Sequence, residues 1–268
     1  MTDENNTDQR METDPTRRTS RSVWAGAIML FGIAAAIAFL LPRATSRESP
    51  TRIQCNRNLR NIGLAIHRYS IKYGCFPPAY TVDKQGRRMH SWRVLLLEFL
   101  DPDLYAQYDF NRPWNAPANL VFAKKMKKDG PYRCPTEEPK DPSWTSYVMF
   151  VGPTAFSNGP NGRKYEEITD GLANTVAVVE MSPSGILWTA PYDLNVSEMS
   201  FEINDPDRPG LRSCHSGCAN VLFVDGYTQF FGTPGATTDA EERRKAQVES
   251  LKAMATINGG EDVSRFSQ

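Results

Sequence analysis

The segment Ala219-Asn-Val-Leu-Phe-Val-Asp225-Gly226-Tyr-Thr-Gln-Phe-Phe231 carries the strongest short-range folding signal of the sequence. Two apolar runs, 219–224 and 227–231, flank an Asp-Gly pair, and this arrangement is typical of a β-hairpin. In a two-residue turn of this kind both central residues take positive φ, which we expect at Asp225 and Gly226. The segment therefore predicts two antiparallel strands near the end of the chain.

Two further segments are expected to form strands. The β-branched run Thr175–Glu180 follows the turn signal Asp170-Gly171, which predicts a buried strand. Thr145–Val151 is the strand candidate within the turn-rich stretch 129–160. Together with the hairpin, these segments predict an antiparallel sheet connected by long loops.

Three segments have helical patterns. In Thr51–Tyr73 apolar residues recur at steps of three and four, which predicts an amphipathic helix with Gly74 as its C-cap. A short helix is expected over 92–100, where Asp101-Pro102 stops it. A final polar helix is expected to begin at Thr238 or Asp239 and to reach about residue 256.

An uncharged apolar run, 23–41, precedes these elements. Nineteen residues at ~1.5 Å of helical rise each nearly cross a bilayer core of about 30 Å, so we expect a transmembrane helix. The alternative is a signal peptide cleaved near Ala44-Thr45-Ser46, but the run exceeds the roughly 7 to 15 residues of a usual signal core. Residues 1–22 have no aliphatic or aromatic side chain and predict a disordered cytoplasmic tail.

The orientation of the membrane segment follows from the size of the domain after it. Arginines flank the apolar run on both sides, so the positive-inside rule does not decide which side of the membrane the N-terminus lies on. Long domains translocate largely regardless of charge. We therefore expect a single-pass protein of the cytoplasmic (inner) membrane, with its C-terminal domain facing the periplasm or the outside.

Composition narrows the classes of function. The 268 residues are 40% hydrophobic and can bury a core, and the formal net charge is +0. A nucleic-acid-binding protein would have an excess of basic residues, so no nucleic acid is expected as a partner. No Gly-x-Ser-x-Gly elbow, His-Glu-x-x-His helix or phosphate-cradling glycine loop occurs, so no enzyme is expected either.

The segment Cys214-His215-Ser216-Gly217-Cys218 raises the question of a metal or haem site. Covalent haem attachment needs the histidine after the second cysteine, and here it lies between the two. A zinc site needs about four ligands, and Cys134 is the residue considered as a further ligand beside Cys214, His215 and Cys218. No second cysteine pair at ligand spacing is present, so we expect no metal and no cofactor.

Disulfides are the other interpretation of the five cysteines. Cys55 and Cys75 cannot pair, because the predicted helix holds them about 27 Å apart whereas bonded cysteines need Cα atoms within about 7 Å. One hypothesis pairs Cys55 with Cys134, and Cys75 with Cys214 or Cys218. The connectivity remains open.

His215 has a functional and a structural interpretation. In the first it is a ligand or general base working with Asp170, Asp193 or Asp225. An extended strand, at roughly 3.3 Å per residue, keeps His215 far from Asp225, so we favour the second, in which His215 bonds a loop carbonyl and pins the hairpin. The three aspartates could also supply oxygens to Ca²⁺, but Asp-Gly pairs mostly mark turns.

A set of motifs occurs in a fixed order between about residues 52 and 261. They are Cys55-Asn-Arg-Asn-Leu-Arg-Asn-Ile-Gly-Leu-Ala-Ile-His-Arg-Tyr69, Phe76-Pro-Pro78, Ser91-Trp-Arg-Val-Leu-Leu-Leu97, Cys134-Pro135, Ile168-Thr-Asp-Gly171 with Asn174-Thr175, Trp188-Thr-Ala-Pro191 with Asp193-Leu194, and His215 ahead of Asp225-Gly226. This set resembles the bacterial family called domain of unknown function 1559, prepilin-like (pseudopilin-like) proteins with an H-x(9)-D-G signature.

The resemblance implies an architecture more than an activity: a pilin-like fold on an envelope-anchored protein with no established biochemical activity. It implies a structural or interaction role, with the lipid bilayer and other envelope or secretion-system proteins as partners. The residues that it marks as a structural motif are Cys55, Cys134, Asp170, Gly171, His215, Asp225 and Gly226.

The chain departs from that family at its N-terminus. Typical members have a Gly-Phe-Thr-Leu-x-Glu junction that prepilin peptidase cuts, whereas here Gly26 is followed by Ala-Ile-Met-Leu-Phe and no acid occurs in 23–41. A carboxylate within lipid persists only where a partner charge meets it, as between pilin subunits. We therefore expect permanent anchoring and no assembly into a filament.

The predicted fold class is α+β, in which an N-terminal transmembrane helix and an amphipathic helix precede and pack on an antiparallel β-sheet, with a short C-terminal helix. The predicted parts are a disordered cytoplasmic tail, 1–22; a transmembrane helix, 23–41; a linker and amphipathic helix, 42–75; a β-rich pilin-like domain, 76–235; and a C-terminal helical tail, 236–268.

Overall fold

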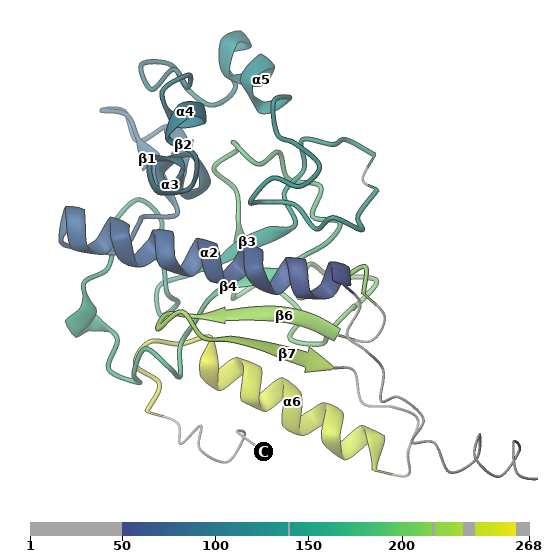
Figure 1. Cartoon of the computed structure of the whole chain (residues 1–268). Helices are drawn as coiled ribbons and strands as arrows, with labels where there is room; N and C mark the ends of the chain where they lie inside the picture. Colours follow the sequence, from purple (N-terminus) through teal and green to yellow (C-terminus); the bar gives the residue numbers. More distant parts are fainter. Residues whose placement is uncertain (1–49, 139, 216–217, 233–238, 261–268) are drawn as a thin grey trace, which may run out of the picture. The chain divides into compact units, whose positions relative to one another are not determined.

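A computed structural model describes residues 50–138, 140–215, 218–232 and 239–260 (Figure 1). The expected cytoplasmic tail and membrane segment, 1–22 and 23–41, lie outside these residues. None of the helices in the described part of the chain combines the length and the apolar composition that a bilayer crossing needs. All of these described residues belong to one compact unit.

A five-stranded sheet organises this unit. Its strands lie in the order β5-β3-β4-β6-β7. Their bounds are Tyr147–Val151 for β3, Val176–Glu180 for β4, Leu194–Asn195 for β5, Cys218–Phe223 for β6 and Thr228–Gly232 for β7. Every pairing is antiparallel except that of β3 with β5, which is parallel. The prediction of a purely antiparallel sheet is therefore wrong at one edge, where a two-residue strand returns from a long loop.

Helices cover both faces of this sheet. The helix α2, Pro50–Tyr73, lies on one side of the β6–β7 hairpin, and α6, Ala240–Met254, lies on the other (Figure 1). Alternate residues of the strands accordingly enter two cores, with Leu222 facing the α2 side and Val221 facing the α6 side. This packing on both faces leaves every residue of β4 and β6 buried, which explains why these strands are mostly apolar instead of alternating between apolar and polar residues.

The remaining elements extend the α2 side of the unit. A short ribbon pairs β1, Tyr80–Val82, with β2, Arg88–Ser91, and leads into α3, Trp92–Leu100. Ser91 caps α3, since its side chain accepts a hydrogen bond from the backbone N–H of Arg93. The last elements here are α4, Pro102–Tyr105; α5, Pro117–Ala123; and the 3₁₀ turn η1, Tyr165–Glu167.

The predicted amphipathic helix, 51–73, is confirmed over its whole range, and α2 begins one residue earlier. One face of α2 is buried through Cys55, Leu59, Ile62 and Ile66, while Gly74 takes φ +74° and donates its N–H to the carbonyl of Ser70. At Gly63 the helix approaches the hairpin so closely that an added Cβ would lie 3.0 Å from a methyl carbon of Leu222. A glycine at this position lets α2 pack tightly on β6.

The Asp-Gly hairpin forms, but with a different turn from the one expected. The N–H of Gly226 donates to the carbonyl of Phe223 at 3.0 Å, and the N–H of Phe223 donates to the carbonyl of Tyr227 at 2.8 Å. Gly226 has φ +91°, whereas Asp225 is not among the described residues with positive φ. This is the pattern of a three-residue turn that ends in a glycine bulge, and the expectation of positive φ at Asp225 is wrong.

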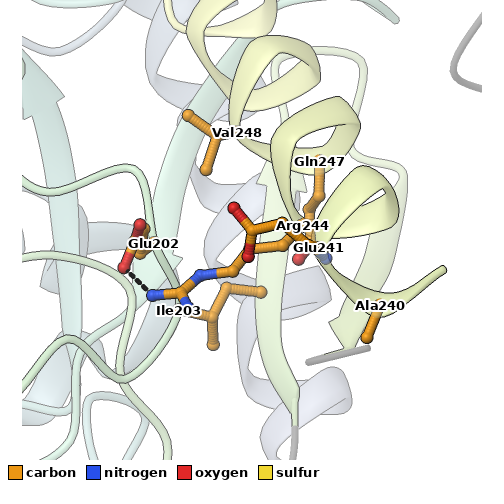
Figure 2. Close-up of a pocket in the computed structure, with 7 residues that line it drawn as sticks. All are labelled: Glu202, Ile203, Ala240, Glu241, Arg244, Gln247 and Val248. Atoms are coloured by element: carbon orange, nitrogen blue, oxygen red, sulfur yellow. Dashed lines mark hydrogen bonds and ion pairs between the residues drawn. The ribbon is translucent and has the colours of Figure 1, made fainter. Parts of the chain in front are cut away.

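A cavity of about 330 Å³ lies where α6 meets the loop at Glu202 and Ile203 (Figure 2). Arg244 of α6 reaches across it and forms an ion pair with Glu202. Both side chains are partly exposed to solvent. The ion pair holds the polar face of α6 against this loop, while Leu251 and Met254 anchor its apolar face in the core.

Candidate functional site

Four side chains from distant parts of the sequence meet on the α2 side of the sheet. They are Cys55 in α2, Cys134 in the loop between α5 and β3, Glu180 at the end of β4, and His215 in the loop before β6. One potential ligand atom from each lies within 4.8 Å of all the others. Among the residues that the structure describes, this is the group arranged to share a metal ion.

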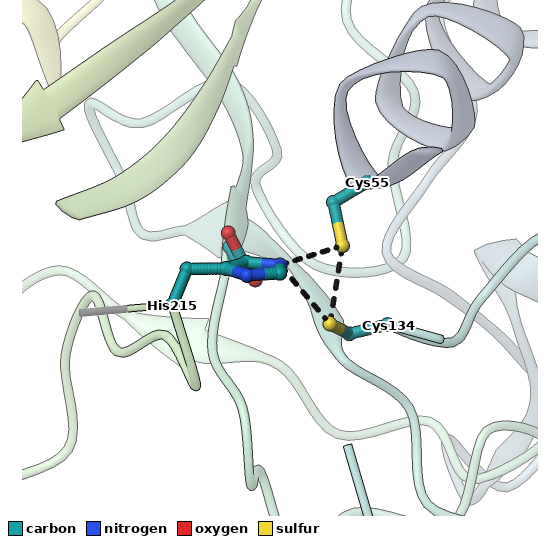
Figure 3. A group of neighbouring side chains, drawn as sticks. Cys55, Cys134 and His215 are labelled. Atoms are coloured by element: carbon teal, nitrogen blue, oxygen red, sulfur yellow. Dashed lines mark hydrogen bonds between the residues drawn. The ribbon is translucent and has the colours of Figure 1, made fainter. Parts of the chain in front are cut away.

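The two sulfurs and the imidazole converge on one point (Figure 3). The Sγ atoms of Cys55 and Cys134 are 3.1 Å apart, and Nε2 of His215 lies 3.3 Å from the first and 3.4 Å from the second. Neither cysteine has any exposed surface. The imidazole therefore contacts two buried sulfurs rather than the loop carbonyl that we expected, which corrects the structural interpretation of His215.

Glu180 brings a carboxylate to the same place and has no exposed surface. Ser213 Oγ donates to its Oε1 at 2.9 Å, and the backbone N–H and side-chain amide of Asn220 donate to its Oε2 at 3.1 and 2.5 Å. Burial raises the pKa of Glu180, and the hydrogen bonds from Asn220 and Ser213 oppose that shift. The carboxylate is thus held in a fixed orientation by neutral donors.

The loop that carries His215 adds a third thiol at the edge of the cluster. Cys214 Sγ lies 3.1 Å from Cys134 Sγ and 3.1 Å from Thr136 Oγ1, and this residue is exposed. The hydrogen bond with Cys134 raises the pKa of the Cys214 thiol, and the contact of Cys134 with His215 raises the pKa of the imidazole. Cys134 is therefore the centre of the group, with contacts to Cys55, Cys214 and His215.

Neighbouring hydrogen bonds fix the backbone around the cluster. Asn58, one turn along α2 from Cys55, donates its amide to the carbonyl of Arg133 at 2.9 Å. The N–H of Cys134 donates to Ser146 Oγ at 2.7 Å, and the N–H of His215 donates to Ser213 Oγ at 3.1 Å. These contacts orient the side chains that converge, as the outer groups of a metal site do.

The structure narrows the disulfide hypotheses. Cys55 and Cys134 are neighbours, as one hypothesis requires, but both are present as free cysteines. Cys214 touches Cys134 at the Cys55 end of α2, whereas Cys75 follows the other end of that helix, about 27 Å away. The pairing of Cys75 with Cys214 is therefore wrong.

The predicted aspartates do not join His215. Asp225 follows the end of β6 and accepts a hydrogen bond from the N–H of Tyr227, while His215 precedes the start of that strand. Asp193 is buried in an ion pair with Arg93. The strand β6, which separates His215 from Asp225, has six residues and spans roughly 20 Å. A joint role of His215 and Asp225 in general-base chemistry has no geometric support.

Asp170 and Gly171 have a structural role: they hold the segment after α6 and form the turn before β4. The carboxylate of Asp170 accepts hydrogen bonds from the N–H groups of Gly259 and Gly260 at 2.7 and 2.9 Å, and from the hydroxyl of Thr256. Gly171 takes φ +93° and forms the turn that leads into β4. The motif therefore fastens the segment after α6 to the sheet. Within the described part of the chain, the group of side chains that could share a metal ion does not include Asp170, Asp193 or Asp225, so the expected calcium ligands are not gathered there.

Sequence reasoning missed Glu180 as a member of the site. The signal was present, because Glu180 ends a strand that is buried at every position and a carboxylate rarely closes such a run without a partner. The other members were named, and Cys134 was considered both as a disulfide partner of Cys55 and as a zinc ligand beside His215, but the three were not expected to meet at one site. Cys55 and His215 are 160 residues apart in sequence, so no local spacing indicates that they meet.

Part of the chain matches a known family model. Residues 44–162 match the model described as a protein of unknown function (DUF1559). This match supports a place in the DUF1559 family for that part of the chain. It contains Cys55 and Cys134, so half of the cluster lies within the matched part. Searches of curated proteins and of solved structures gave no match.

Proposed function

We propose that this DUF1559 protein is a membrane-anchored, pilin-like envelope protein with a structural or interaction role rather than an enzymatic one. A retained helix at 23–41 holds it in the cytoplasmic membrane, and residues 49–268 lie outside. The observation that carries the proposal is the exposed face of α2, the first element after the proposed anchor.

That face is both apolar and cationic. Ile53, Leu64 and Ile71 are 38%, 58% and 82% exposed, and they fall on the helix face opposite the buried stripe. The exposed arginines between them are Arg57, Arg60 and Arg68. No Asp or Glu occurs in α2. The surface suits a protein partner that presents acidic and apolar side chains, because opposite charges steer the encounter and apolar groups supply contact area.

The enzyme alternative loses support from the same geometry. Its proposed partners for His215 lie elsewhere, with Asp193 paired to Arg93 and Asp170 bound to the segment after α6. The ligand-binding alternative, in contrast, gains one specific observation, the Cys55–Cys134–His215–Glu180 cluster. That cluster is compatible with a structural role.

Photocrosslinking in living cells tests the proposed interaction face. A photoreactive residue at Leu64 should give a discrete crosslinked product with another envelope protein, and the same residue at Val121 should not, although Val121 of α5 is 64% exposed. Reversing the charges of Arg60 and Arg68 to Glu should abolish the product. Crosslinks to lipid alone, or a product insensitive to charge reversal, would contradict the proposed partner.

A further inference from the structure

We propose that Cys55, Cys134, His215 and Glu180 bind one divalent transition-metal ion, with Zn²⁺ as the best match, in a closed structural site. The observation behind this is the convergence of two sulfurs, an imidazole nitrogen and a carboxylate within 4.8 Å of one another in the interior of the fold. The proposed metal site does not depend on the proposed interaction role of α2.

The donor set fits zinc by its chemistry. Zinc takes four ligands drawn from thiolate, imidazole and carboxylate, and closed four-ligand sites are structural. Calcium and magnesium prefer sets made only of oxygen ligands, so a site with two sulfurs disfavours them. Binding displaces the protons of the two thiols, because thiolate is the form that coordinates the ion.

The distances between donors fit a tetrahedral ion after a small opening. With Zn–S near 2.3 Å and Zn–N near 2.0–2.1 Å, tetrahedral ligands place two sulfurs about 3.8 Å apart and sulfur and nitrogen about 3.6 Å apart. The observed separations are 3.1 Å for the sulfurs, and 3.3 and 3.4 Å from the sulfurs to Nε2. An outward shift of a few tenths of an ångström per ligand makes room for the ion.

A disulfide accounts for less of the same geometry. It would require the sulfurs of Cys55 and Cys134 to close from 3.1 Å to about 2.05 Å. It would give no role to the imidazole, which lies almost equally far from both sulfurs, and none to the carboxylate. A shared cation explains all four groups together.

Glu180 supplies the reason for a cation at this place. Its side chain is fully buried, and the donors that reach it are Ser213 and the amide groups of Asn220, all of them neutral. A buried carboxylate is stable when a charge or a metal offsets it. Ser213 and Asn220 would then act as the outer hydrogen bonds that orient a ligating carboxylate.

Cys214 marks the route by which the ion enters. It contacts Cys134 from the solvent side and lines a hollow of about 600 Å³ together with Thr136, Glu137 and Trp144. Cys214 is not within the set of mutually close ligand atoms. We therefore assign it to exchange of the ion rather than to the finished site, so its removal should slow loading and leave occupancy unchanged.

Metal analysis of the full-length chain, purified in detergent, tests the site. After incubation with Zn²⁺ and desalting, the protein should retain about one ion per chain. Cys134→Ser should lower occupancy at least tenfold, and so should Glu180→Gln, which keeps the shape of the side chain. The matched control is Cys75→Ser, beyond the far end of α2, and it should retain the ion.

Two further readouts keep the test decisive if a variant folds poorly. Co²⁺ bound to the unaltered chain should show sulfur-to-metal charge-transfer bands and the intense visible bands of a tetrahedral site, both lost on adding Zn²⁺. When the metal is removed in the presence of an alkylating reagent at the moment of cell lysis, Cys55 and Cys134 should both be recovered as modified thiols. A Cys55–Cys134 disulfide in that material, or zinc retention equal in Cys134→Ser and the unaltered chain, would overturn the site.

Discussion

Arg93 and Asp193 form the ion pair that fixes α3 to the sheet. The guanidinium of Arg93 donates to Asp193 Oδ1 at 2.6 Å and to the carbonyl of Tyr147 at 3.0 Å, and both charged side chains are almost completely buried. The same carboxylate oxygen accepts hydrogen bonds from the indole of Trp92 and the N–H of Met149. One carboxylate thereby connects the start of α3 with the edge of the sheet.

Removing the charge of Asp193 should therefore destabilise the fold. Asp193→Asn leaves the Arg93 guanidinium buried without a counterion, and we expect the free energy of unfolding to fall by about 3–5 kcal/mol in denaturant titrations. The control is Lys245→Gln, which breaks an exposed pair with Glu241 and should cost less than about 1 kcal/mol. Equal losses in the two variants would show that the buried pair has no special role.

His90 gives the fold a pH dependence on the acid side. Its ring contacts the hydroxyl of Tyr108 at 3.1 Å and the carbonyl of Phe110 at 3.0 Å, and burial lowers the pKa of His90. A lowered folded-state pKa contributes stability above the unfolded value of about 6.5, and this contribution is lost as the pH falls through the folded value.

Unfolding free energies at pH 7.5 and pH 5.5 measure this effect. We expect the unaltered chain to lose stability on acidification, and His90→Gln to lose less, because the variant has no imidazole to protonate. The comparison uses the difference between the two pH values, so a constant cost of the substitution cancels. An identical acid-induced loss in both proteins would exclude His90 as its source.

At the scale of elements, the β6–β7 hairpin joins the central strands to α2. Its turn depends on Gly226, whose φ of +91° is unfavourable for residues with a side chain. An added Cβ at this position would meet no atom nearer than a ring carbon of His67 at 4.0 Å, so the constraint lies in the backbone and not in packing.

Substitutions at Gly226 separate these two causes. Gly226→Val should lower the free energy of unfolding by about 1–2 kcal/mol, because left-handed backbone is costly for side chains with a Cβ. Gly226→Asn should cost clearly less, since Asn tolerates that region. Thermal and denaturant melts measure both variants, and an unchanged stability of Gly226→Val would contradict the role of the turn.

The elements with local signals could be predicted from the sequence. The α2 and α3 helices and the strands β3, β4, β6 and β7 match their expected ranges within about two residues, because apolar spacing, Gly74 and Asp101-Pro102 act over short distances. The parallel edge strand β5 could not be predicted, since two residues carry no pattern. The ligand cluster could not be predicted either, because tertiary packing alone brings Cys55, Cys134, Glu180 and His215 together.

For the whole molecule, the described part of the chain begins several residues after the expected membrane segment, 23–41. The first described residue is Pro50, and α2 runs from it along the sheet with its cationic face exposed. The ligand cluster brings Cys55, near the beginning of α2, together with the end of β4 and with the loops that precede β3 and β6. A metal in this cluster would thus make the end of α2 that carries Cys55 rigid relative to the sheet.

Protease treatment of spheroplasts, followed by mass spectrometry of the membrane fraction after carbonate extraction, tests the anchored topology most directly. The account predicts that the intact chain stays in the membrane with 1–48 attached, and that added protease removes residues 49–268 while leaving a protected N-terminal fragment. A mature chain that begins near Arg47, or a C-terminal unit that resists protease until the membrane is broken, would contradict it.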